Sequence, residues 1–215
     1  MNETAISAAV LAAGGARRMG RQKLLLEVDG QAIVRRVAAE IVALSPREVL
    51  VVVSPEGGEA IAAALRGLPI RIVVNERARE GLGTSIAAAA SSVAPSAEAM
   101  LLVQGDQPLV DRSMLEALIG EWRDVRAPFV ASSYGGIVTT PVVFSRAVFG
   151  ELRALGGDVG ARAVLQRHAS TGRVVAFPAE RGSDVDTPGD YRRILELWAT
   201  CARPSRPPNV SCRHG

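Results

Sequence analysis

The stretch ISAAVLAAGGARRMGRQK, residues 6–23, decides the fold class of this chain. Its first part, residues 6–11, is an apolar run of the length of a buried strand, and it leads into a turn rich in alanine and glycine. Residues 32–44 then place apolar side chains at the spacing of one face of a helix. A buried strand, a glycine-rich turn and an amphipathic helix together predict one βα unit.

The same alternation continues along the chain. Further strands are predicted at residues 49–53, 70–74, 100–103, 129–132, 142–144 and 174–177. Further helices are predicted at residues 59–65, 84–90, 113–122, 146–152 and 160–167, with a last helix beginning after Pro188. This order predicts an α/β fold of three layers, in which helices cover both faces of a mostly parallel, Rossmann-like sheet. Ligands of such sheets bind beyond the carboxyl ends of the strands, so we expect the function in the loops after strands.

The composition indicates one domain with a tail. The chain has 215 residues, of which 48% are hydrophobic, and this is enough for one substantial core but near the lower limit for two. No linker interrupts the alternating pattern, so a single domain is expected over residues 1–200. Residues 201–215 are rich in proline and arginine and carry Cys201, Cys212 and His214. We expect these three residues to belong to a disordered end and not to a metal site.

Charge and hydropathy exclude several classes of partner. The net charge of +3 belongs to the tail, because the 22 acidic residues of the chain are matched by as many basic residues before residue 201. A neutral body with 4% aromatic residues lacks the basic stripe and the stacking side chains of nucleic-acid binders. No apolar run approaches the roughly 18 residues that span a bilayer, and no basic leader precedes an apolar signal segment. We therefore expect a cytoplasmic protein with no nucleic-acid or membrane partner.

The loop after the first strand is suited to bind an anion. Gly14 and Gly15 let the backbone approach a ligand and expose its N–H groups, and Arg18 and Lys23 add positive charge. Lys23 is the only lysine among the 25 basic residues, so here a compact ammonium replaces the guanidinium used everywhere else. The loop contains neither the GxGxxG pattern of dinucleotide-binding proteins nor a Walker A sequence, which argues against hydride transfer and P-loop chemistry.

Two aspartates follow other predicted strands. Asp106 comes soon after the strand at 100–103, and Asp186 lies between the strand at 174–177 and the last helix. Carboxylate oxygens are the ligands that Mg²⁺ prefers, and a Mg²⁺-nucleotide also needs amides and cations around its phosphates. The three loops together therefore predict a site for a metal ion and nucleotide phosphates.

Several motifs carry a family resemblance. Residues 11–23, LAAGGARRMGRQK, resemble the signature LAAGxSxRMGxxK of the MobA-like nucleotidyltransferases, and within that family the chain most resembles the molybdenum-cofactor cytidylyltransferases. Further matching segments are Asn75 with GLGTS at 81–85, GDQP at 105–108, PVVF at 141–144, GDVGAR at 157–162 and DVDTP at 184–188. Two departures are Ala16, where serine is usual, and Thr139-Thr140, where relatives often show Gly-His. The resemblance implies a nucleotidyltransferase fold over residues 6–198.

The resemblance also implies an activity. It is the transfer of CMP from CTP to the terminal phosphate of molybdenum-bearing molybdopterin, with release of pyrophosphate. CTP and the molybdopterin cofactor would be the substrates, Mg²⁺ the metal with Mn²⁺ as the alternative, and a molybdoenzyme the receiver of the product. Guanylyl transfer, nucleotidyl transfer to a sugar or polyol phosphate, and a non-catalytic molybdopterin chaperone stay open as alternatives.

Roles for individual residues follow from the same resemblance. The expected catalytic residues are Arg18, Lys23 and Asp106, and the expected metal ligands are Asp106 and Asp186. Nucleotide binding is expected from Leu11, Ala12, Ala13, Gly14, Gly15, Arg18, Lys23, Asn75, Gly83 and Ser85. Acceptor binding is expected from Thr140, Pro141, Asp158 and Arg162. An acceptor phosphate is already largely dianionic near neutral pH, so no general base is expected.

Overall fold

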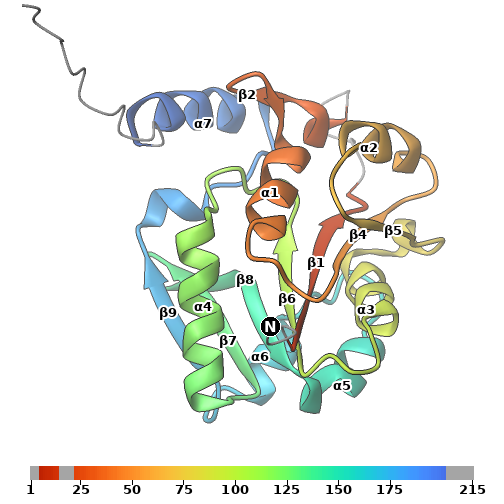
Figure 1. The fold of residues 1–215 in the computed structure, drawn as a ribbon. Coiled ribbons are helices and arrows are strands. Elements are labelled where there is room, and N and C mark those ends of the chain that lie inside the picture. The colour runs from red at the N-terminus through yellow and green to blue at the C-terminus, as the bar shows by residue number, and fades with distance from the viewer. Residues whose placement is uncertain (1–4, 15–21, 202–215) are drawn as a thin grey trace, which may run out of the picture.

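A sheet of seven strands forms the centre of the fold in the computed structural model, which describes residues 5–14 and 22–201 (Figure 1). The strands follow the order β5-β4-β1-β6-β8-β7-β9 across the sheet. Their bounds are β1 (Ile6–Ala12), β4 (Val49–Val53), β5 (Arg71–Val74), β6 (Ala99–Gln104), β7 (Phe129–Tyr134), β8 (Ile137–Ser145) and β9 (Arg173–Phe177). Every strand predicted from the sequence is present, and the predicted α/β class is confirmed.

The sheet is mostly parallel. β4 and β6 both pair in parallel with β1, β5 pairs in parallel with β4, and β9 pairs in parallel with β7. β8 runs antiparallel to its neighbours β6 and β7. Because β8 follows β7 after a short Gly135-Gly136 turn, these two strands form a hairpin, and a hairpin is necessarily antiparallel.

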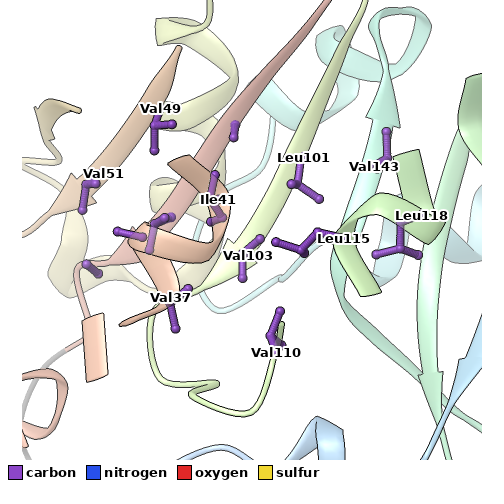
Figure 2. Close-up of a cluster of buried hydrophobic side chains, with 14 of the residues drawn as sticks. Val37, Ile41, Val49, Val51, Leu101, Val103, Val110, Leu115, Leu118 and Val143 are labelled. Carbon is purple, nitrogen blue, oxygen red and sulfur yellow. The ribbon is translucent and has the colours of Figure 1, made fainter. Parts of the chain in front are cut away.

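Helices cover both faces of the sheet, as predicted. α1 (Ile33–Val42), α2 (Gly58–Ala64) and α4 (Arg112–Val125) pack on one face. α3 (Leu82–Ser92), α5 (Phe149–Arg153) and α6 (Arg162–Arg167) pack on the other. The side chains of a strand alternate between the faces, so Val49 and Val51 join the α1 side and Leu50 joins the α3 side. Figure 2 shows the first of these clusters.

A small hairpin and the last helix add a third cluster that the sequence did not predict. The hairpin consists of β2 (Glu27–Val28) and β3 (Gln31–Ala32), and the last helix is α7 (Pro188–Cys201). Together they bury Leu26, Val28, Ile33, Leu109, Val185 and Ile194. The Arg36 guanidinium stacks 3.8 Å from the centre of the Trp198 ring. In Figure 1 α7 lies beside β2 and α1 at one end of the molecule.

Short 3₁₀ turns complete the described chain. They are η1 (Lys23–Leu25), η2 (Ala78–Glu80), η3 (Arg146–Val148) and η4 (Ala179–Gly182). None of the helices in the described part of the chain combines the length and apolar character needed to cross a bilayer. Cys201 ends α7, and the remainder of the predicted tail lies outside the described residues.

Candidate functional site

Lys23 connects the two aspartates that were predicted to bind a metal. Its Nζ atom lies 2.7 Å from Asp106 Oδ2 and 2.7 Å from Asp186 Oδ1. Lys23 begins η1, Asp106 lies between β6 and α4, and Asp186 precedes α7. Three segments distant in the sequence therefore meet at one ammonium group. The side chains of Lys23 and Asp106 are only 14% and 13% exposed, whereas that of Asp186 is 46% exposed.

Backbone hydrogen bonds hold the two aspartate loops together. The Gly105 N–H donates to the Leu11 carbonyl, which joins the loop after β6 to the end of β1. The Val185 N–H donates to the Asp106 carbonyl at 3.2 Å, which joins the two aspartate segments directly. Asp190 Oδ2 accepts from the N–H groups of Asp186 and Thr187, and so caps the start of α7. The position of Asp186 thus depends on how α7 is docked.

The charges at this cluster perturb one another. Burial alone would lower the pKa of Lys23, but the charges and hydrogen bonds of Asp106 and Asp186 outweigh it and raise that pKa above 10.5. Desolvation and the charges of both aspartates raise the pKa of the nearby Asp184 above its usual value. Lys23 is therefore a permanent cation at neutral pH, set among three carboxyl groups.

The donor set fits a divalent cation. Asp106 Oδ1 is buried and has no hydrogen-bond partner among the described residues, which leaves a hard anionic oxygen available to a ligand. No group of three or more His, Cys, Asp or Glu side chains suited to a metal occurs among the described residues. Mg²⁺ is ordinarily held by one or two carboxylates together with substrate phosphates and water, so the pair Asp106 and Asp186 meets its needs.

A cavity of about 720 Å³ adjoins the end of β1 and is the candidate nucleotide pocket. Its lining includes Ala13, Gly14 and Ser85, three of the predicted nucleotide-binding residues. Residues that sequence reasoning missed also line it, among them Gln22, Ser54 and Arg79. Ser54 directly follows β4, so the rule that ligands bind after strands would have identified it.

Two other predicted nucleotide-binding residues, Asn75 and Gly83, do not line this pocket but contact residues next to it. The buried Asn75 uses its amide to donate to the hydroxyls of Thr84 and Ser85, at 2.9 and 3.0 Å, so it holds Ser85 in place. A Cβ atom on Gly83 would lie 2.6 Å from the Val159 carbonyl oxygen, so glycine permits close packing there. Ala12 is buried in the core, and Gly15 and Arg18 lie outside the described residues.

A second cavity, of about 710 Å³, is the candidate acceptor pocket. Predicted acceptor residues Thr140 and Arg162 line it, together with Leu11, which was predicted to contact the nucleotide. Most of its other walls are apolar, and they include Ile86, Leu102, Phe129, Val142 and Leu165. Leu82, at the start of α3, lines both cavities, so the two pockets are neighbours.

The structure separates the remaining two predicted acceptor residues from this pocket. Asp158 lines the first cavity, beside Gly81, and not the second. Pro141 is buried in β8, where its carbonyl accepts a hydrogen bond from Ser132 Oγ at 2.9 Å. Neighbouring Thr140 donates to Gln107 Oε1, so the strand that lines the acceptor pocket is tied to the residue after Asp106.

Comparisons with known proteins identify the family. The MobA-like NTP transferase domain matches residues 8–172. The purine catabolism protein PucB of Bacillus subtilis (strain 168) is 30% identical over 195 residues, which cover 86% of this chain and 93% of PucB. The nicotine blue oxidoreductase of Paenarthrobacter nicotinovorans is 28% identical over 201 residues, which cover 88% of this chain and 96% of that protein.

One of the solved structures matches this chain over most of its length. The crystal structure of Rv0371c from Mycobacterium tuberculosis H37Rv matches with a TM-score of 0.80 and 31% sequence identity, over 91% of this chain and 100% of that chain. Its complex with manganese matches over the same shares with a TM-score of 0.77 and 30% identity. The chain therefore belongs to the MobA-like NTP transferase domain family, whose chemistry is nucleotidyl transfer.

Proposed function

We propose that the chain transfers CMP from CTP to the terminal phosphate of molybdenum-bearing molybdopterin and releases pyrophosphate. The observation that carries the proposal is the pair Asp106 and Asp186, joined by Lys23, within a fold that also forms two neighbouring cavities of different character. A transferase of this kind needs one pocket for each substrate and a cluster of charges for the phosphates that react.

The first cavity suits the nucleotide. Ala13 and Gly14 present small residues at the end of β1, and the hydroxyls of Ser54 and Ser85 offer polar contacts. The Asp158 carboxylate accepts hydrogen bonds only, so it favours a base edge with an amino group, such as that of cytosine, over the carbonyl edge of uracil. The choice of cytosine over guanine rests on the resemblance, and it is the part of the proposal that the nucleotide assay tests.

The second cavity suits an acceptor with a flat apolar body and an anionic end. Its walls of Ile86, Phe129 and Leu165 are apolar, whereas Arg162 supplies a guanidinium on an exposed side chain. A guanidinium presents a planar fork of donors that fits phosphate. A molybdopterin phosphate, with its heteroaromatic ring system, has this distribution of polarity.

Positioning and charge neutralisation account for the mechanism. Asp106 and Asp186 would hold Mg²⁺, which supplies Lewis-acid stabilisation of the charge on the phosphates. The chain holds the α-phosphorus of the nucleotide in line with an oxygen of the acceptor phosphate, so that the new P–O bond forms as the bond to pyrophosphate breaks. Lys23 and Arg18 would neutralise the departing pyrophosphate. No side chain has to remove a proton, because the acceptor phosphate is already ionised.

The named relatives support parts of this proposal. Rv0371c was crystallised in complex with manganese, which supports a divalent cation in this fold. PucB is named for purine catabolism, and the relative from Paenarthrobacter nicotinovorans is named nicotine blue oxidoreductase. Neither name specifies a nucleotide acceptor, so the acceptor of this chain has to be tested directly.

A pyrophosphate-release assay tests the proposal. The purified chain is given Mg²⁺, molybdenum-bearing molybdopterin and CTP, GTP, ATP or UTP in turn. We expect pyrophosphate release with CTP that depends on the acceptor. A clear preference for GTP would indicate guanylyl transfer, and release with a sugar phosphate in place of molybdopterin would change the acceptor. Tight binding of molybdopterin without release from any nucleotide would indicate the chaperone instead.

A further inference from the structure

We infer that Lys23 competes with free divalent cations for Asp106 and Asp186, and that these carboxylates take up a metal only when nucleotide phosphates draw the ammonium away. The inference rests on the proposed function, because it assumes that the two aspartates are the metal ligands. It adds that the chain discriminates against free metal ions and favours a metal that arrives with a nucleotide.

The contact geometry is the first argument. Lys23 Nζ lies at 2.7 Å from one oxygen of each aspartate, so both carboxylates already share a single cation at full hydrogen-bonding contact. Mg²⁺ binds carboxylate oxygens at about 2.0–2.1 Å. A metal ion held by these two carboxylates would lie within a few ångströms of the ammonium. Two positive charges that close repel each other, so the metal and the ammonium compete for the same pair of carboxylates.

The charges make the competition strong. Burial leaves the Lys23 and Asp106 side chains only 14% and 13% exposed, so their attraction is weakly screened by water. Displacement of Lys23 by a free ion would therefore leave a buried ammonium without its partners, which is unfavourable.

Nucleotide phosphates remove this obstacle. Lysine carries its charge on a flexible stem with three donors, so the ammonium can leave the aspartates for another anion nearby. Gly14 borders the candidate nucleotide pocket, as does Gln22, which immediately precedes Lys23. Phosphates in that pocket would offer Lys23 new charge-assisted hydrogen bonds at the moment when the metal takes the carboxylates. Binding of metal and of nucleotide would then be mutually reinforcing.

Mn²⁺ binding to the protein without nucleotide is the first test. Free Mn²⁺ is measured by electron paramagnetic resonance for the wild type, Lys23→Met, Lys23→Met/Asp106→Asn and the matched control Arg126→Met, which removes a positive charge from an exposed pair with Glu98. Lys23→Met is expected to bind Mn²⁺ about 5- to 150-fold more tightly than the wild type, the range of ordinary coupling energies. The double variant is expected to lose this gain, and Arg126→Met is expected to match the wild type. Equal affinity of Lys23→Met and the wild type would overturn the inference.

A second test uses the wild type alone. Because Lys23 is the only lysine of the chain, labelling with ¹³C-lysine gives one εCH₂ signal in the NMR spectrum. We expect this signal to stay in place when Mg²⁺ is added alone and to shift when Mg²⁺ and CTP are added together. A shift with Mg²⁺ alone, at the concentration that saturates turnover, would overturn the inference even if Lys23→Met does not fold.

These tests are separate from the test of the proposed function. Wild-type protein that releases pyrophosphate from CTP but shows no gain of Mn²⁺ affinity in Lys23→Met refutes the inference and leaves the function standing. A gain of affinity that Asp106→Asn abolishes, in a protein that releases no pyrophosphate, supports the metal competition and refutes the function.

Discussion

Replacement of Asp106 by asparagine is expected to remove turnover while the fold stays intact. The change keeps the size of the side chain and one oxygen that can accept a hydrogen bond. It removes the negative charge next to Lys23 Nζ and one of the two carboxylate oxygens, of which Oδ1 has no hydrogen-bond partner in the described part of the chain. A metal ion supplies several kcal/mol of transition-state stabilisation, and each 1.36 kcal/mol corresponds to a factor of ten in rate. A loss of about 4 kcal/mol would lower kcat on the order of a thousandfold.

The effect of the same change on stability is expected to be small. Lys23 keeps its contact with Asp186 at 2.7 Å, so the ammonium is not left unpaired. A hydrogen bond to a charged group contributes about 1.5–3 kcal/mol, and asparagine retains part of it, so the free energy of unfolding should fall by less than about 2 kcal/mol. For a domain of this size such a change lowers Tm by only a few degrees, on the order of 2–4 °C for each kcal/mol.

The assay compares Asp106→Asn with Glu98→Gln, which removes one negative charge from an exposed pair with Arg126 outside the site. Pyrophosphate release is measured at saturating Mg²⁺, and unfolding is followed by circular dichroism. Glu98→Gln is expected to match the wild type in turnover. Turnover of Asp106→Asn within tenfold of the wild type would remove Asp106 from the metal site, and turnover unchanged by a chelator would refute the metal altogether.

Three further outcomes are expected. Lys23→Ala should lower kcat and kcat/KM for CTP together by roughly ten- to a hundredfold in steady-state assays. Lys23→Arg should recover little of this loss, because a guanidinium is larger than an ammonium and planar. An arginine variant as fast as the wild type would show that charge alone matters. Arg162→Ala should raise KM for the acceptor and leave KM for CTP unchanged, and an unchanged acceptor KM would show that Arg162 does not contribute to acceptor binding. Burial alone would raise the pKa of Glu48, but hydrogen bonds from Arg71, the Ala94 N–H and Ser7 outweigh burial and lower that pKa below 4.5. The ionised Glu48 carboxylate therefore stabilises the fold at pH values above 4.5, and this stabilisation is lost as the pH falls through the lowered pKa. Glu48→Gln should accordingly be less stable than the wild type in urea unfolding near pH 7, and the difference should shrink as the pH falls below 4.5. A difference that stays constant from pH 7 into the acidic range would contradict the assignment.

Local patterns in the sequence determined the elements of the fold. The apolar run of β1 and the helical spacing of apolar residues in α1 are patterns among neighbouring residues, so they can be recognised without knowledge of the rest of the chain. The placing of Asp106 and Asp186 near one another also followed from the sequence, since both were expected in loops after strands. Their roles, and those of the other predicted site residues, stay predictions.

Only the tertiary structure decided how these parts are combined. Asp158 and Arg162 are four positions apart in the sequence but line different cavities, because the chain changes direction before α6 begins at Arg162. The hairpin β2–β3 and the docking of α7, which set the position of Asp186, depend on burial between residues distant in the sequence. The contact of Lys23 with both aspartates likewise joins three separate segments. Periodicity reports which face of an element is buried, whereas pairing between distant segments depends on packing and charge that no local pattern records.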